Sequence, residues 1–240
     1  NLGVRVARLE DRVGNVKVTG DARLRYKDAE HAKSKFDARA RVQFNAKVND
    51  RTDAVVRLTS GNFEFGDANK TVNATVDRAY VNHKFGERVS VKAGRFGQVI
   101  GGGLAYDDAF DGAQFNAGND KVNFQAAYGY ALAGVNGVKT EKNAQLAVVN
   151  LNGKVGKHAN VGGFYTRVNG EDLKSPASAK AYKNIYGFNT DFNFDKVWVG
   201  GEWLKASNVD KSQAWTAGIG YGNYNQAKQG TWDVKAQYFN

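Results

Sequence analysis

The sequence predicts an all-β protein whose strands form a transmembrane antiparallel β-barrel. Three observations support this fold class: apolar and polar residues alternate over long segments, long and short connections alternate along the chain, and aromatic residues gather near the expected strand ends. The 240-residue chain has a mean hydropathy of −0.55 and lacks the run of about 18 apolar residues that a membrane-spanning helix needs. Barrel strands need only about 9–11 residues with every second one apolar, so this low hydropathy is compatible with a membrane barrel.

The first two expected strands show the alternation most clearly. Residues 16–27 carry apolar or small side chains at even positions and polar or charged ones at odd positions. Residues 36–48 repeat the pattern, again with the apolar residues at even positions. Strands of soluble sandwiches usually have about 5 or 6 residues. Two consecutive strands of 12 and 13 residues fit a membrane wall about 25 Å tall better.

Eleven further segments complete a prediction of thirteen strands. Residues 73–85 and 143–155 alternate poorly, which indicates a β-bulge or a face that packs on protein instead of lipid. Outer-membrane barrels have an even number of strands, so we expect about 16 in the complete barrel, of which about 13 are present here. The further segments are residues 53–65, 73–85, 89–96, 109–117, 121–130, 143–155, 159–168, 182–194, 197–206, 213–224 and 231–239.

The connections between these segments alternate in length. The connections at 27–35, 66–72, 98–108, 131–142 and 169–181 are long, whereas those at 49–52, 86–88, 118–120, 156–158 and 195–196 are tight. Outer-membrane barrels have short periplasmic turns and longer external loops, and soluble sandwiches and propellers do not predict this parity. We therefore expect the amino terminus on the periplasmic side. The connection at 223–230 is an exception to the rule.

The composition limits the possible chemistry. The chain has no cysteine, which excludes disulfides and thiolate metal sites, and its three histidines are far apart in sequence. We expect no metal site, no cofactor and no enzymatic activity, because no Ser/His/Asp arrangement is legible. The net charge of +10 suits nucleic acid, an anionic membrane surface or an anion-attracting cavity. Since the basic residues are spread along strands and not gathered in a tail, we expect no nucleic-acid partner.

A basic face and a glycine-rich, acidic segment are the candidate functional features. If the polar face lines a water-filled lumen, a basic wall opposite an inward acidic loop makes a transverse field that orders hydrated solutes. The alternative is that these charges are solvated surface residues of a soluble sheet. The predicted basic wall comprises Arg23, Arg25, Arg39, Arg41, Arg57, Lys92 and Arg95. The predicted constriction loop comprises Gly101, Gly102, Gly103, Tyr106, Asp107, Asp108 and Asp111.

Residues 1–14 differ from the rest of the chain. Four apolar residues are spaced by 4, 3 and 4, as in the seam of a coiled coil, and a glycine at position 14 is a plausible helix stop. A short amphipathic helix that packs on its own domain is an equally good interpretation of this spacing. We expect residues 1–14 to be the end of a periplasmic coiled-coil stalk and residues 15–240 to be the barrel, incomplete at its carboxyl end. The expected seam comprises Leu2, Val6, Leu9 and Val13.

Two stretches of the sequence resemble a known family. Residues 92–97 (KAGRFG), the glycine-rich segment after them and residues 110–115 (FDGAQF) resemble the third-loop region of the trimeric general porins. In that family a strand-ending Gly-Arg precedes a loop folded into the pore, and an Asp-Gly-hydrophobic strand follows it. The spacing of the seam just before the first strand resembles the OmpM-type porins of diderm Firmicutes. In that subfamily a coiled coil links the barrel to S-layer-homology domains that grip the cell wall.

The resemblance implies a function, which we state as an expectation. It implies a homotrimeric porin in the bacterial outer membrane, in contact with lipid and lipopolysaccharide, through which small hydrophilic solutes and ions diffuse passively. It also implies attachment to peptidoglycan or its attached polymer through an N-terminal domain that this sequence lacks. Two alternatives stay open at this point: a barrel that is mainly a membrane anchor with a closed pore, and a soluble basic β-protein that binds polysaccharide or nucleic acid.

Overall fold

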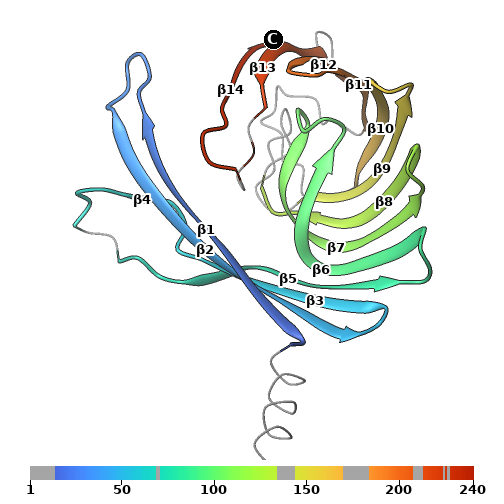
Figure 1. Ribbon diagram of the computed structural model, residues 1–240, viewed down its shortest axis with the longest axis horizontal. Helices are drawn as coiled ribbons and strands as arrows, with labels where there is room; N and C mark the ends of the chain where they lie inside the picture. The colour runs from blue at the N-terminus through green and yellow to red at the C-terminus, as the bar shows by residue number, and fades with distance from the viewer. Residues whose placement is uncertain are drawn as a thin grey trace, which may run out of the picture. The chain divides into compact units, whose positions relative to one another are not determined.

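The computed structural model describes residues 14–68, 71–133, 144–169, 184–207, 213–223, 225 and 228–240. These residues form an antiparallel sheet of fourteen strands whose order follows the sequence, except that the short β4 lies off this path and pairs with β2 (Figure 1). Within the described ranges, no helix is long and apolar enough to cross a lipid bilayer. The strands are β1 (Val16–Lys27), β2 (Lys35–Asn49), β3 (Thr52–Thr59), β4 (Phe63–Glu64), β5 (Thr75–Lys84), β6 (Val89–Ile100), β7 (Tyr106–Gly118), β8 (Val122–Ala131), β9 (Ala144–Val155), β10 (Ala159–Asn169), β11 (Asn184–Phe194), β12 (Val197–Ala206), β13 (Gln213–Gly222) and β14 (Asp233–Phe239).

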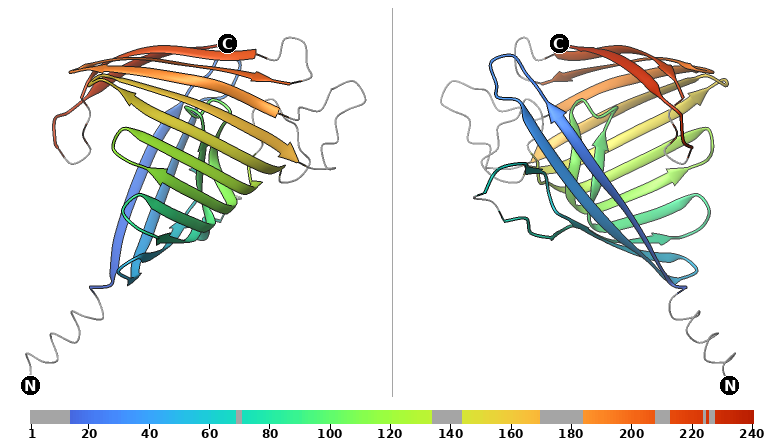
Figure 2. Two further views of the ribbon diagram at one scale, coloured as in Figure 1. Left: turned by 90° about the vertical axis from the view of Figure 1, so that its right-hand side faces the viewer. Right: turned by 60° about the vertical axis from the view of Figure 1, so that its left-hand side comes forward.

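The chain divides into two compact units. The first unit contains β1 to β5 and the segment Lys92–Phe96 of β6, and the second contains the rest of β6 and β7 to β14. Figure 2 shows the meander of the second unit from two further sides.

The strands of the first unit sort their side chains onto two faces, as the sequence predicts. In the β1–β2 ladder, Val18 lies opposite Phe44, and one residue pair further along, Thr19 lies opposite Gln43. Because successive side chains of a strand point to opposite faces, this register collects the apolar residues on one face and the charged ones on the other. The apolar face is solvent-accessible over large side chains: Val18 is 58% exposed and Leu24 is 70% exposed.

The outer face of the second unit is also apolar and exposed. In neighbouring ladders, Tyr165 on β10 lies opposite both Val149 on β9 and Tyr186 on β11. On β13, Ile219 is 58% exposed although it belongs to an apolar row. An exposed apolar surface that continues over many strands is typical of a face that contacts lipid or another protein.

The opposite face of β9 explains why residues 143–155 alternate poorly. Leu146 and Val148 are fully buried on this face, so both faces of the strand are apolar there. The prediction of a face packed on protein is therefore confirmed for β9. The prediction of a bulge is confirmed for residues 73–85, because the β3–β5 register shifts between Arg57 and Leu58.

The thirteen strands of the main sheet path agree with the predicted number, whereas some predicted boundaries are wrong. The expected strand at residues 53–65 is two strands, β3 and the two-residue β4, separated at residues 60–62. In that connection Gly61 adopts a φ of +66°, a left-handed conformation that ends a strand. The largest difference is at residues 98–108, where the expected long loop is mostly strand and only 101–105 connect β6 to β7.

Two facing glycines bring β7 and β8 unusually close together. Gly112 lies opposite Gly129 in the β7–β8 ladder. A Cβ atom at either position would collide with a backbone carbonyl oxygen of the other strand, that of Tyr128 or that of Asp111. Only glycine fits at both positions, and the pair lies at the middle of β7.

A matched pair of lysine substitutions on β9 tests the assignment of the two faces. Leu151 is 51% exposed on the apolar outer face, and the neighbouring Asn152 is exposed on the other face. We expect Leu151→Lys to destabilise the protein in lipid vesicles by about 2–4 kcal/mol, because a lysine on the lipid face near the bilayer centre is costly. The measurement is guanidinium unfolding followed by tryptophan fluorescence. Asn152→Lys is the control, and equal stability losses for the two variants would contradict the assignment.

Candidate functional site

The connection between β6 and β7 folds onto the inner face of the second unit. The turn at 101–105 is short, yet its amides reach side chains of β9 and β12. In Figure 1 the turn end of β7 lies on the concave side of the curve formed by β8 to β12. The part of the chain that sequence analysis predicted as an inward loop is therefore the tip of an inward-bent hairpin, which we call the inturned hairpin (Val99–Phe110).

Glu202 of β12 holds the tip of the inturned hairpin. The Gly102 N–H donates a hydrogen bond of 3.0 Å to Glu202 Oε1, and the Leu104 N–H donates one of 3.2 Å to Oε2. The side chain is 6% exposed, and it joins residues about 100 positions apart in the chain. Both oxygens of a buried carboxylate thus accept hydrogen bonds from turn amides, and charge-assisted hydrogen bonds of this kind are stronger than neutral ones.

Asn150 of β9 and a set of glutamines extend this anchor. The Gly101 N–H donates to Asn150 Oδ1 at 3.1 Å, and Asn150 Nδ2 donates to the Val99 carbonyl at 3.0 Å. Gln98 Nε2 donates to Gln125 Oε1 at 2.8 Å, and Gln114 Nε2 donates to Gln98 Oε1 at 2.6 Å. Gln98 and Gln114 are buried. Together with Gln125 and Asn150 they form a hydrogen-bonded network between four strands, and this network fixes the position of the hairpin on the sheet.

The glycines of the tip make the close approach possible. Gly101 has a φ of +62°, and a Cβ there would lie 2.5 Å from the Phe164 ring and 2.6 Å from Glu202 Oε1. A Cβ at Gly102 would lie 2.5 Å from Glu202 Oε2. Gly103 also has a positive φ, +99°, but its Cβ would meet no atom within 3.4 Å. Gly101 is therefore required by its backbone conformation and by its contact with the Phe164 ring, and Gly103 is required by its backbone conformation alone.

The acidic residues predicted for the loop lie on strand β7. Asp107 and Asp108 are exposed, and Asp111 is half-buried. Asp107 and Asp111 share one face of the strand, whereas Asp108 is on the other with Phe110, which is fully buried. The Asp108 side chain accepts a hydrogen bond of 2.6 Å from the Ala109 N–H. Their spacing in sequence suggested one acidic cluster, but the three carboxylates lie on two faces of the strand and do not form one.

Tyr106 has a structural role at the start of β7. The side chain is 3% exposed, and its hydroxyl donates a hydrogen bond to the Ala109 carbonyl. The Ala133 N–H in turn donates to this hydroxyl at 3.4 Å. The predicted constriction residue is thus a buried brace of the inturned hairpin.

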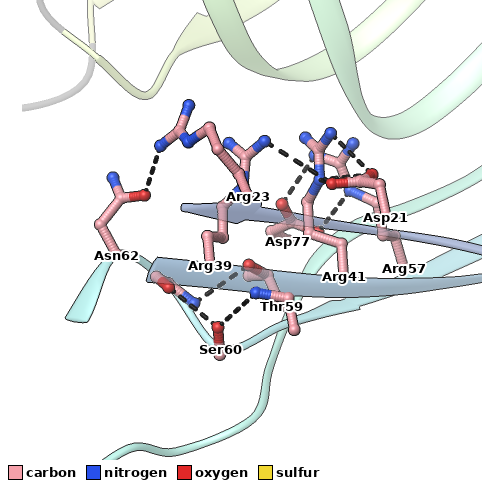
Figure 3. Close-up of polar contacts among 11 residues, drawn as sticks. Asp21, Arg23, Arg39, Arg41, Arg57, Thr59, Ser60, Asn62 and Asp77 are labelled. Carbon is pink, nitrogen blue, oxygen red and sulfur yellow. Dashed lines mark hydrogen bonds and ion pairs between the residues drawn. The ribbon is translucent and has the colours of Figure 1, made fainter. Parts of the chain in front are cut away.

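Five of the predicted basic residues lie together on the polar face of the first unit. In the β1–β2 register, Arg23 lies opposite Arg39, and Arg41 lies opposite Asp21, while Gln43 next along lies opposite Arg57 of β3. We call this group the arginine face: Arg23, Arg25, Arg39, Arg41 and Arg57. Figure 3 shows all of them except Arg25. Because like charges so close together repel, the group needs compensation.

Aspartates that sequence analysis did not single out supply this compensation. Arg57 binds Asp77 through two hydrogen bonds of 2.9 Å and 2.7 Å, with both side chains mostly buried (Figure 3). Asp21 lies 2.8 Å from the Arg41 guanidinium and 3.7 Å from that of Arg39. The sequence indicated that Asp21 and Asp77 could share a face with the arginines, since both occupy polar positions of alternating segments. Only the strand register shows which arginines they contact.

The remaining arginines of this face have other partners. Arg25 forms three hydrogen bonds with the Asp37 carboxylate, the shortest of 2.7 Å. Arg23 Nη2 donates to Asn62 Oδ1 at 2.7 Å (Figure 3). The Nε atoms of Arg23 and Arg39 are buried without a hydrogen-bond partner in the described part of the chain. The arginine face therefore carries five cations against three carboxylates, and two of its guanidinium groups are incompletely satisfied.

The last two predicted basic residues are on β6. The Lys92 ammonium lies over two aromatic rings, 5.1 Å from the Tyr80 centroid and 5.5 Å from the Phe96 centroid. Arg95 is partly exposed on the same strand. The predicted stalk seam at Leu2, Val6, Leu9 and Val13 lies outside the described residues, so the coiled coil stays a prediction. Among the residues that the structure describes, no group of His, Cys, Asp or Glu side chains is arranged to hold a metal ion.

An antiparallel meander with an apolar outer face, a charged inner face and an inturned hairpin defines the class of β-barrel channels. Residues 10–191 match the family described as "Putative porin", and this match covers more than half of the chain. The chain therefore belongs to this porin family. Membership makes it a channel protein of the bacterial outer membrane and not an enzyme. No curated protein matches the sequence.

Solved porin structures share the fold. A variant of the Rh. blastica porin with an alanine replaced by lysine matches with a TM-score of 0.63 and 12% identity, over 94% of this chain and 84% of that chain. A second variant of the same porin, with an alanine replaced by tryptophan, has a TM-score of 0.58 and 12% identity, over 86% and 79% of the two chains. At this level of identity the likeness shows the fold alone.

Removing the Glu202 carboxylate tests its role as the anchor of the hairpin. We expect Glu202→Ala to lower the opening free energy at the tip by about 1–3 kcal/mol, because two turn amides lose their acceptors. Amide hydrogen exchange at Gly102 and Leu104 would then be roughly tenfold to a hundredfold faster. Glu202→Gln, which keeps one acceptor oxygen, should fall in between. Glu64→Gln, on the short strand β4, is the control, and unchanged exchange in Glu202→Ala would overturn the assignment.

Proposed function

We propose that this porin lets small hydrophilic solutes and ions diffuse passively through a water-filled pore that the inturned hairpin narrows. The observation that carries the proposal is the position of the hairpin tip, which Glu202 and Asn150 hold on the inner face of the second unit. A hairpin held by buried hydrogen bonds reduces the cross-section of the pore permanently. Moving the hairpin away from the inner face would leave its hydrogen-bonding groups unpaired. The pore is then narrowed and not gated by a freely moving loop.

The arginine face supports a weak preference for anions. Its five guanidinium groups outnumber Asp21, Asp37 and Asp77, and Lys92 adds to the excess. Charged groups that line a narrow aqueous path select ions of the opposite charge without binding them tightly. The exposed carboxylate of Asp108, on the same face of β7 as Phe110, supplies the negative charge that a transverse field needs.

The assembly and position of the porin are also proposals. We infer a homotrimer in the outer membrane whose amino terminus is periplasmic, in contact with lipid and lipopolysaccharide. The tight turns at one end and the long connections at the other support this orientation. The OmpM-like spacing of the N-terminal seam supports a tether to peptidoglycan or its attached polymer through a further N-terminal domain. A barrel of about 16 strands would enclose an aqueous channel.

Two alternatives are less well supported. In a soluble polysaccharide-binding protein, large apolar side chains such as Ile219 and Phe188 would be exposed to water, which is unfavourable unless they bind a partner. A barrel that is mainly an anchor with a closed pore agrees with the inturned hairpin but does not need the compensated charges of the arginine face.

Single-channel recording distinguishes the pore from the anchor. The detergent-purified protein is added to a planar bilayer with a KCl gradient, and the conductance and reversal potential are measured. Stepwise insertions in groups of three, with weak ion selectivity, are the expected result. Stable insertion without conductance would sink the open-pore proposal and favour the anchor.

Substitutions of opposite sign on the arginine face test its role in selectivity. We expect Arg39→Gln with Arg41→Gln to shift the reversal potential toward that of a cation-selective pore, and Asp21→Asn to shift it the other way. In a tenfold KCl gradient each shift should be roughly 5–20 mV, a fraction of the about 59 mV that full selectivity gives. Shifts of the same sign in both variants would show that this face does not line the conducting path.

A further inference from the structure

A pocket lies at the turn end of the first unit, away from the arginine face. Its volume is about 370 Å³, and it is lined by the start of β1, β3 and β6 and the end of β2 and β5. Three lysines, Lys17, Lys47 and Lys92, line it from three different strands. The pocket is on the charged face of the strands, because Lys17 pairs with Asn45 in the ladder that also pairs Asp21 with Arg41.

The charge of this pocket is poorly compensated. Asp53 is the carboxylate among its lining residues, against three ammonium groups. Lys47 also lies 3.7 Å from Asp50, which is fully exposed to solvent. Within the described ranges, Lys17 and Lys92 have no carboxylate within ion-pair distance, whereas Arg25, Arg41 and Arg57 of the neighbouring arginine face each do. The pocket therefore keeps a net positive charge that a bound anion would neutralise.

The position of Lys92 is fixed by the fold. Gly94 has a φ of +124°, and a Cβ there would lie 2.8 Å from the Tyr80 Cα, so the glycine lets Tyr80 lie close against β6. The Tyr80 and Phe96 rings meet edge to face at 6.2 Å, and the Lys92 ammonium lies over both. These cation–π contacts hold the Lys92 ammonium at one place in the lining of the pocket, which lowers the entropic cost of binding an anion there.

Neutral donors complete the lining. Asn82 and Tyr80 of β5 line the pocket, and their side chains carry an amide and a hydroxyl that can donate hydrogen bonds. An ammonium group, an amide N–H₂ and a phenol together match an oxyanion, whose oxygens accept several hydrogen bonds at once. Chloride, with a single spherical charge, would leave most of these donors to water.

From this combination we propose that the pocket binds a small, multiply charged oxyanion with the chemistry of inorganic phosphate. The proposal deepens the proposed function, since the anion reaches the site from the water-filled side of the barrel. Phosphate in lipid headgroups has the same chemistry, but the lining residues are on the face opposite to exposed apolar residues such as Val18. The occupant we expect is therefore the free solute.

Two lysine substitutions test the site in the full chain. In neutral-lipid planar bilayers with KCl, we expect added potassium phosphate at pH 7 to reduce the chloride current in a saturable way. Lys17→Gln with Lys92→Gln should raise the half-blocking phosphate concentration by roughly tenfold, because two of three compensating charges are lost. Lys27→Gln with Lys35→Gln is the matched control, since it removes two lysines from the opposite end of the same β1–β2 face. The control should move the half-blocking concentration less than about twofold.

A second measurement separates this proposal from the proposed function. The ³¹P line width of phosphate is measured with detergent-solubilised protein that is free of phospholipid, so that no conducting pore is required. Broadening with the unaltered protein and the control, lost in Lys17→Gln/Lys92→Gln, supports the site even if no conductance is found. Equal broadening by all three proteins overturns the proposal, as does the absence of broadening in all of them. Broadening only when lipid is added would assign the site to a headgroup phosphate and overturn the free solute as its occupant.

Discussion

The structure depends on one constraint, that backbone N–H and C=O groups in hydrocarbon must find partners within the protein. An antiparallel meander meets it by pairing each strand with its sequence neighbours, and this is why strand order follows chain order from β5 to β14. The same ladders sort side chains by parity, so Val18 faces lipid while Thr19 faces the interior. The apolar exterior and the charged arginine face are thus two results of one pairing rule.

At the tip of the inturned hairpin, side chains and not neighbouring strands pair with the backbone amides. Amides at the tip leave the ladder, and side chains take the place of a neighbouring strand: Glu202 for Gly102 and Leu104, and Asn150 for Gly101. The arginine face follows a similar logic, because Asp21 lies near two guanidinium groups, and Asp37 and Asp77 each pair with one. In the lysine-lined pocket at the turn end of the first unit this compensation is incomplete, and we propose that a bound anion neutralises the remaining positive charge.

The period-two pattern predicted much of the fold. The bounds Val16–Lys27 and Val197–Ala206 agree with the structure because the alternation is unbroken there and each segment stops at a change of composition. The break at Ser60–Asn62 was missed, since Gly61 interrupts a segment whose pattern resumes two residues later. At residues 98–108 the glycines suggested a loop, but they are needed for contact with Phe164 and Glu202, residues far along the chain. The partners of Glu202, Asp21 and Asp77 depend on register and on contacts across up to about 100 residues, which no local pattern encodes.

The link between the hairpin tip and Glu202 has a consequence for the order in which the protein is built. The acceptors for Gly102 and Leu104 are on β12, so this part of the molecule is a contact of very high sequence separation. Contacts of this kind are made late, because a long stretch of chain must first be ordered between their ends. A partly inserted barrel that has reached β9 but not β12 would already hold Gly101 through Asn150 while the next two turn amides still bind water. The attachment of Gly102 and Leu104 to Glu202 is therefore a late event of assembly.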